Sequence, residues 1–170
     1  AANAVRVTVR LNDPVADEQL WAEKYSGKLE DIFEIQEQIS RKIVDALKMR
    51  LSPQEDQQLR ERPIDDIEAL ECYHRALREI HRFTKEGLEN ALDLIQNALD
   101  IVGDNELLYA ARGSVYRQYF NASIRSDDDD IAKAEECAAK VFALNPDSAA
   151  GHELLGLIEV SKGRFGEAMR

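Results

Sequence analysis

The stretch Asn145-Pro146-Asp147-Ser148 separates two segments whose small and apolar residues recur at helical spacing. The helix before it, residues 134–144, must end here because Pro146 cannot continue a helix. A second helix is expected to begin near Ala149 and to end before the turn at Gly163. Gly156 lies inside this second helix, where a small residue allows another helix to approach closely. The stretch therefore predicts a helix-turn-helix unit that stacks on similar units.

Earlier residues repeat this arrangement. Gly103-Asp104-Asn105 ends a helical segment in the same way, and Gly113 follows it as Gly156 follows Pro146. In the second helices of two units, Ala91, Ile95, Ala98 and Ile101 correspond to Ala134, Ala138, Val141 and Leu144. The residues expected to pack one unit against the next are Ala76, Ala91, Ala98, Gly113, Ala134, Gly156, Ala168 and Pro146.

These units resemble tetratricopeptide (TPR) repeats over about residues 69–170. Gly113 and Gly156 are 43 residues apart, whereas the TPR period is about 34 residues, so about nine residues are inserted. We assign the insertion to the polar stretch 121–130. The predicted repeats are 67–103, 104–146 and a truncated 147–170. Three features depart from the family pattern: Gly103 replaces the usual proline, His152 replaces an aromatic residue, and the second repeat has the long loop.

The first 51 residues have a different pattern. Val5, Val7, Val9 and Leu11 alternate with polar residues, which predicts a strand at about 4–12. A second strand is predicted at about 19–26, joined to the first by a loop of about seven residues. Apolar residues at helical spacing then predict a helix at about 31–50 that covers the hairpin. Asp31 and Glu34 are expected to form a capping box at its start. The predicted fold class is mainly α, a TPR superhelix preceded by a small partial α/β module.

The strings Leu20-Trp21-Ala22-Glu23-Lys24-Tyr25 and Asp31-Ile32-Phe33-Glu34-Ile35-Gln36 resemble the second half of a TolB-amino-terminal-like (FlgO-like) module. In bacterial signalling proteins such a module precedes a TPR array. The resemblance implies that the opening strand and helix of the module would lie before Ala1. Residues 52–66 are expected to form a polar spacer helix and linker. Ser52-Pro53-Gln54-Glu55 has the residues of a helix start, and Asp65 with Glu68 is expected to open the following helix.

Composition narrows the choice of partners and compartment. The net charge of −11 disfavours nucleic acid and anionic membrane surfaces. Hydrophobic residues make up 44% of the chain and can form a core, and no apolar run is long enough to cross a membrane. Cys72 and Cys137 are interpreted as reduced core thiols. These features indicate a cytoplasmic protein, or a periplasmic one if the parent protein carries an upstream membrane anchor.

Metal sites and catalytic sites are weakly indicated. His152-Glu153 begins like a zinc-protease helix, but Gly156 stands where the second histidine is needed. His74 and His81 share a helix face without a third ligand, and residues 127–130 lack the spacing of a calcium loop. The acidic run is interpreted instead as the first turn of a helix. No catalytic residues, metal site or cofactor are therefore expected.

The remaining candidate is a groove. In TPR proteins the first helices of successive repeats line a concave surface, and the resemblance carries this role to Leu70, Tyr73, Leu77, His81, Leu107, Ala110, Ser114, Arg117, Gln118, Glu153, Leu157 and Val160. Such a lining suits an amphipathic helix or an extended peptide. Alternatively, the helix at 31–49 or its neighbour fills the groove from within. The set of Lys, Asn and Arg residues that clamps a terminal carboxylate in chaperone-binding members is missing.

The family resemblance implies a non-catalytic interaction or scaffolding segment of a larger bacterial signalling protein. Two alternatives remain. The chain is the regulatory part of a serine/threonine kinase or nucleotide cyclase whose catalytic domain is elsewhere, or it is a self-assembly module. Self-assembly would use the strand at 4–12 or the truncated last repeat, because each would leave an unpaired edge or apolar face.

Overall fold

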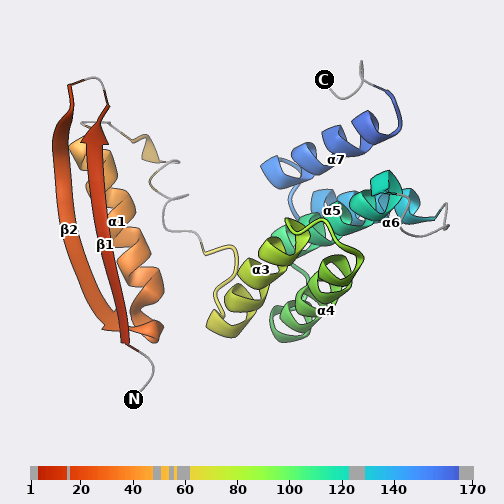
Figure 1. Cartoon of the computed structure of the whole chain (residues 1–170), viewed down its shortest axis with the longest axis horizontal. Helices are drawn as coiled ribbons and strands as arrows, with labels where there is room; N and C mark the ends of the chain where they lie inside the picture. Colours follow the sequence, from red (N-terminus) through yellow and green to blue (C-terminus); the bar gives the residue numbers. More distant parts are fainter. Residues whose placement is uncertain are drawn as a thin grey trace. The chain divides into compact units, whose positions relative to one another are not determined.

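The computed structural model describes residues 4–14, 16–47, 51–53, 56, 62–122 and 129–164 (Figure 1). The chain divides into two compact units, Ala1–Arg62 and Pro63–Arg170. A β-hairpin and a helix form most of the described part of the first unit, and helices form that of the second. The expected fold class, mainly helical with a small two-stranded hairpin at the start, is confirmed.

The hairpin consists of strands β1 (Ala4–Asp13) and β2 (Glu18–Lys28), which pair antiparallel from Ala4 opposite Lys28 to Asp13 opposite Glu18. The register shifts at Leu11/Asn12. Both strands are longer than expected, so the predicted loop of about seven residues is wrong and only 14–17 connect them. Asp13 Oδ1 accepts a hydrogen bond of 3.1 Å from Ala16 N and closes this tight turn.

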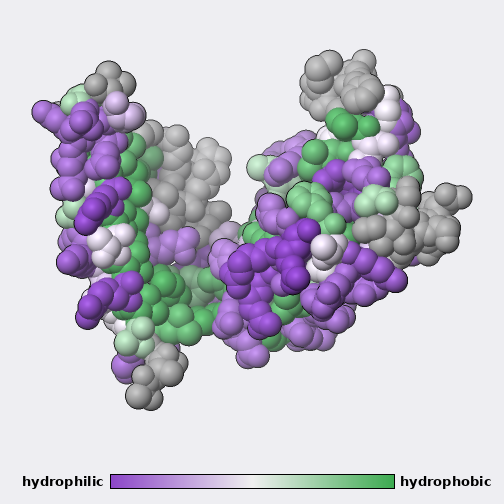
Figure 2. All heavy atoms as spheres, viewed as in Figure 1, coloured by the Kyte–Doolittle hydropathy of each residue, from purple (hydrophilic) through white to green (hydrophobic). Residues whose placement is uncertain are grey.

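Helix α1 (Ile32–Ala46) packs on one face of the hairpin, after a single 3-10 turn at Leu29–Asp31. Ile35 from the helix and Tyr25 from β2 are the buried apolar residues at this contact. Figure 2 shows hydrophobic residues along the junction between hairpin and helix and hydrophilic residues along the outer face. The predicted capping box is wrong: Asp31 makes no side-chain cap to α1, and its Oδ2 accepts from Lys28 N at 2.7 Å, because the helical turn begins three residues earlier.

Only part of the predicted spacer lies within the described residues. Pro53 and Asp56 are helical, and Asp56 N donates to Ser52 O at 3.0 Å. Residues 54, 55 and 57–61 lie outside the description. The next helix begins at Ile67, and its capping residue is Asp66 rather than the predicted Asp65, because the Asp66 side chain accepts the hydrogen bond from Ala69 N.

The described part of the second unit consists of two helical hairpins and a further helix. Its elements are α3 (Ile67–Ile80), α4 (Lys85–Val102), α5 (Glu106–Ala122), α6 (Asp130–Leu144) and α7 (Ala149–Ser161). Helices α3 and α4 pack as one pair and α5 and α6 as the next, while α7 packs on both α5 and α6 (Figure 1). Helix α5 also contacts α3 and α4, so it lies at the centre of the unit.

Small residues allow these helices to approach. Gly113 in α5 is the tightest such position: a Cβ there would lie 2.4 Å from Leu154 Cδ2 in α7 and 3.1 Å from Cys137 Cβ in α6. Gly156 is half-buried, and Ala168 lies outside the described residues. The alanines predicted to pack between helices are all fully buried, namely Ala76, Ala91, Ala98 and Ala134. Ile101 and Leu144, which end the matched faces of α4 and α6, are instead 42% and 46% exposed.

Side-chain caps also fix the starts of α4 and α7. Thr84 Oγ1 accepts from Gly87 N at 3.0 Å, so α4 begins at Lys85. Ser148 Oγ accepts from Gly151 N at 3.1 Å and starts α7. Asn145 and Pro146 lie between α6 and α7, as the sequence predicts.

Candidate functional site

Helices α3, α5 and α7 together border a cavity of about 330 Å³. Its lining combines apolar side chains from all three helices with a few polar groups, and Phe83 is contributed by the turn between α3 and α4. We call this cavity the groove. Its lining residues are Tyr73, Leu77, Ile80, His81, Phe83, Leu107, Ala110, Ala111, Ser114, Arg117, Gln118, Ala150, Glu153, Leu154 and Leu157.

The structure brings together all of the residues expected to line a groove except Leu70 and Val160. Leu70 is half-buried against the core of the unit, and Val160 is 44% exposed outside the cavity. The helical lining residues that the sequence reasoning missed are Ile80, Ala111, Ala150 and Leu154. Each lies three or four positions from an expected residue, so a broader helical stripe would have found them.

A second cavity, of about 210 Å³, adjoins the groove because Phe83, Arg117 and Gln118 line both. Leu88 of α4 and the last turn of α5, Asn121 and Ala122, complete its lining. We call it the side cavity. Phe83 is 69% exposed and has a positive φ of 53°, a conformation that is rare for a bulky residue.

The two ends of the groove carry different charges. At one end Tyr73 lies near Glu153, and burial together with the negative charge of Glu153 raises the pKa of the Tyr73 hydroxyl. At the other end burial lowers the pKa of the Arg117 guanidinium. His81 Nδ1 lies 2.6 Å from Leu77 O, so this ring nitrogen carries a proton and donates it. The groove therefore presents an acid at one end and a poorly hydrated cation at the other.

Two polar atoms at the cationic end have no hydrogen-bond partner among the described residues: Arg117 Nε and Gln118 Oε1. Both atoms are buried, and the Gln118 residue is only 9% exposed. Most buried polar groups in folded proteins are hydrogen-bonded, so an exception needs an explanation.

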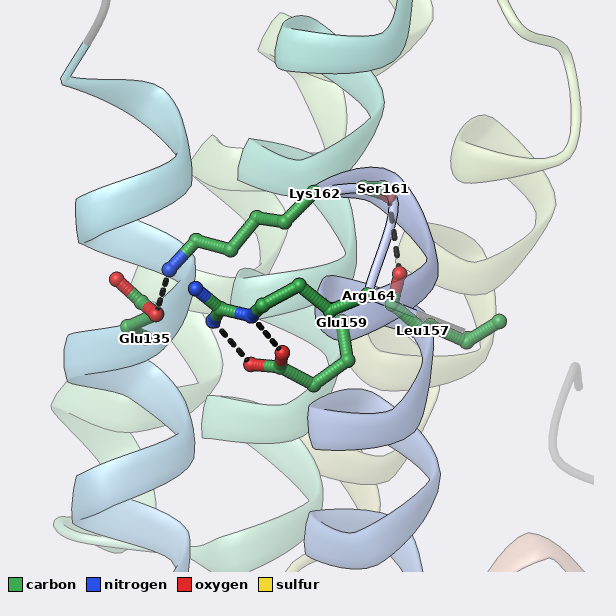
Figure 3. A network of polar contacts seen from close by, with 6 residues as sticks. All are labelled: Glu135, Leu157, Glu159, Ser161, Lys162 and Arg164. Atoms are coloured by element: carbon green, nitrogen blue, oxygen red, sulfur yellow. Dashed lines mark hydrogen bonds and ion pairs between the residues drawn. The ribbon is translucent and has the colours of Figure 1, made fainter. Parts of the chain in front are cut away.

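Polar contacts at the end of α7 fix the helix that carries Leu157 (Figure 3). Arg164 folds back to pair with Glu159, its Nη2 donating to Glu159 Oε1 at 2.7 Å, and Lys162 pairs with Glu135 of α6. Ser161 Oγ donates to Leu157 O at 2.9 Å. The Lys162–Glu135 pair connects the end of α7 to α6, and the other two contacts stabilise the last turn of α7, which forms one wall of the groove.

A third hollow, of about 380 Å³, lies between α3 and α4 and is mostly polar. Arg75, Arg78 and Glu79 of α3 and Asp93 of α4 line it, so it carries two positive and two negative side chains. Within the described ranges, no three or more His, Cys, Asp or Glu side chains gather as a metal site. In this same part of the chain, no helix has the length and apolarity needed to cross a bilayer. Cys137 is buried, and burial raises the pKa of its thiol to about 11, so it is a poor nucleophile.

The chain is similar to a known protein over nearly its whole length. A curated protein of Rhizobium meliloti (strain 1021), named "Putative adenylate cyclase 3", is 27% identical over 169 residues. The match covers 99% of this chain but 29% of that protein. No family model matches the chain, and no solved structure matches it. The similarity therefore fits a segment of a larger signalling protein.

Proposed function

We propose that this chain is a non-catalytic interaction segment of a bacterial signalling protein and that its groove binds a peptide or helix from a partner protein. The observation that carries the proposal is the groove itself: an apolar hollow between three helices, with unpaired polar atoms at one end. Apolar pockets with a few convergent polar groups are the usual form of a binding site.

We further propose that the paired helices are TPR repeats and that the β-hairpin unit is the second half of a TolB-amino-terminal-like module. The supporting observations are the pairing of α3 with α4 and of α5 with α6, and the tight position of Gly113 between α6 and α7. Repeat arrays of this kind bury a continuous core by contacts between neighbouring units.

Selection of random peptides displayed on phage, with the whole chain as target, tests the binding function. Ser114→Trp fills the middle of the groove and serves as the blocked variant, while Ala139→Trp adds the same side chain at an exposed position of α6. We expect the selected peptides, once synthesised, to bind the wild type and Ala139→Trp equally and to bind Ser114→Trp at least about tenfold more weakly. Failure to select any peptide, or equal binding to both variants, would contradict the proposal.

A second candidate places the chain as the regulatory part of an adenylate cyclase, which the relative's printed name favours. A serine/threonine kinase parent is the other possibility that the family resemblance raised. Under either parent, this chain binds no nucleotide itself. Isothermal titration calorimetry of the chain with ATP checks this, and specific binding at micromolar concentration would contradict it.

Self-association is the remaining alternative. Within the described residues, β1 pairs with β2 along one edge only, and an unpaired edge can accept a strand from another chain. Sedimentation equilibrium over a wide concentration range distinguishes it: assembly through β1 predicts a dimer whose fraction rises with concentration, and a constant monomer mass would exclude this alternative.

A further inference from the structure

Two unpaired polar atoms lie at the cationic end of the groove. Arg117 Nε and Gln118 Oε1 belong to neighbours in sequence at the boundary between the groove and the side cavity. In the described structure neither atom has a hydrogen-bond partner, and neither is accessible to bulk water. Both residues line the groove and the side cavity, so a ligand that satisfies both atoms must supply an acceptor for Arg117 and a donor for Gln118.

The positive charge of Arg117 indicates which kind of acceptor the ligand should supply. Arg117 is partly removed from water, and an ion pair in such a place is less screened than one at the surface. Among the described residues no carboxylate forms an ion pair with Arg117, and the charge of Glu153 acts on Tyr73 at the other end of the groove. An acidic group from a ligand therefore complements Arg117, and the planar guanidinium suits a carboxylate in particular.

Phe83 supplies a second, independent observation at the same place. Its ring is largely exposed, borders both cavities and belongs to a backbone with positive φ. Strained residues of this kind concentrate at ligand-binding sites. An exposed aromatic ring beside an unpaired cation offers an apolar contact immediately next to the acidic group.

The side cavity favours a carboxylate from an acidic side chain over the C-terminal carboxylate of a peptide. It continues past Arg117 to Asn121 and Ala122, one helical turn further along α5. A peptide lying in the groove can therefore extend beyond Arg117 into the side cavity. A peptide whose C-terminal carboxylate paired with Arg117 would end there and would leave the side cavity empty. From Leu107 to Ala122 the helix rises about 22 Å, which matches about seven residues of extended peptide.

On the basis of the proposed binding function, we propose that the groove recognises an internal segment of a partner protein in which an aspartate or glutamate is flanked by apolar residues. The acidic side chain pairs with Arg117, and a backbone N–H of the segment donates to Gln118 Oε1. Apolar side chains of the segment contact Phe83 on one side and Leu77, Leu107 and Leu157 on the other.

The test uses the whole chain and pools of synthetic peptides of about seven residues, the length set by the groove. Each pool has random apolar and small residues around a fixed central Asp, Asn or Lys, with both peptide ends blocked. A further pool carries a terminal Asn with a free carboxylate. The protein variants are Arg117→Gln and, as the matched control, Arg112→Gln, because Arg112 lies on the same helix outside the groove and donates to Gln96.

We expect the wild type to bind the Asp pool at least about tenfold tighter than the Asn pool, as a desolvated ion pair requires. The Arg112→Gln variant retains this ratio, Arg117→Gln reduces it to about one, and Gln118→Leu weakens binding of the Asp and Asn pools alike. Equal binding of the Asp and Asn pools to the wild type would overturn the proposal, as would a preference that survives Arg117→Gln.

Two other outcomes identify a different occupant and also overturn the proposal. Tighter binding of the free-carboxylate pool than of the blocked Asp pool would show that a chain terminus is read. A concentration-dependent dimer that Arg117→Gln dissociates would show that a second copy fills the groove. If the proposed binding function itself is wrong, no peptide pool shows binding that Ser114→Trp weakens. If only this inference is wrong, Ser114→Trp still weakens peptide binding, but the Asp and Asn pools bind equally.

Discussion

The contact of Gly113 with Leu154 gives a sharp test of how the helices are held together. A Cβ at position 113 would lie 2.4 Å from Leu154 Cδ2 and 3.1 Å from Cys137 Cβ. Leu154 is 1% exposed, so its side chain has little room to move. Overpacking of this kind costs about 2 kcal/mol, while Ala gains about 1 kcal/mol over Gly inside a helix. We expect Gly113→Ala to lower the free energy of unfolding by about 1 kcal/mol, from the difference of these terms.

The sign of this effect should reverse when Leu154 is truncated. Leu154→Ala alone should cost about 2–5 kcal/mol because it leaves a cavity in a tightly packed place. In that background the methyl group introduced at position 113 no longer meets the leucine side chain, so the gain in helix propensity dominates. Gly113→Ala should then raise the free energy of unfolding by about 1 kcal/mol.

Urea denaturation followed by far-ultraviolet circular dichroism measures these changes, since the second unit contains most of the described helices. With a slope of about 2 kcal/mol per molar urea, Gly113→Ala shifts the midpoint by about 0.5 M in each background, down in the wild type and up in Leu154→Ala. Trp21, the sole tryptophan of the chain, belongs to the first unit, so its fluorescence follows that unit separately. Ser114→Ala is the matched control and should have the same small effect in both backgrounds. Stabilisation by Gly113→Ala in the wild-type background would refute the reasoning.

Three further variants test the cap of α7, the conformation of Phe83 and the buried thiol of Cys137. Ser148→Ala removes the hydroxyl that caps α7 by accepting from Gly151 N, and it should cost about 1 kcal/mol in the same urea assay; no change would show that the cap is unimportant. Phe83→Asn suits the positive φ and should raise stability by about 1 kcal/mol while weakening peptide binding, whereas loss of both would show that the ring supports the fold. The Cys137 thiol has a pKa raised from 9.0 to about 11 by burial, so its stabilising contribution is complete below about pH 9 and is lost as the pH rises through 11. Between pH 8 and 11 the urea midpoint should therefore fall less steeply in Cys137→Ala than in the wild type, and parallel curves would contradict this. In the native protein the half-buried Cys72 should react with a thiol reagent before Cys137 does.

The arrangement of small residues made the helical unit predictable. Ala91 of α4 and Ala134 of α6 hold the same place in the second helices of the two pairs, and a buried alanine has few alternatives to a helix-helix contact. The exact helix starts were less predictable. Asp65 and Asp66 are chemically identical neighbours, and which of them caps α3 depends on backbone geometry rather than on residue type. The same limit explains why Asp31 was assigned to the wrong helix start.

The groove was predictable only as a set of helix faces. The residues on one face of each of α3, α5 and α7 predicted most of its lining, because the spacing along a single helix determines which residues share a face. The burial of Arg117 and the exposure of Phe83 were not predictable in this way. Burial of Arg117 depends on the side chains that other helices bring beside it, and the positive φ of Phe83 arises from closing the turn between α3 and α4.

Helix α5 performs two tasks with adjacent residues. Gly113 faces α6 and α7, and Ser114, Arg117 and Gln118 line the groove. Leu154 takes part in both, since it contacts the Gly113 position and also lines the groove. A ligand in the groove must therefore favour the state in which α7 is packed on α5, because the groove loses a wall when α7 detaches. Binding and the packing of the last described helix are then linked, and a ligand that binds only the packed state stabilises it in proportion to its occupancy.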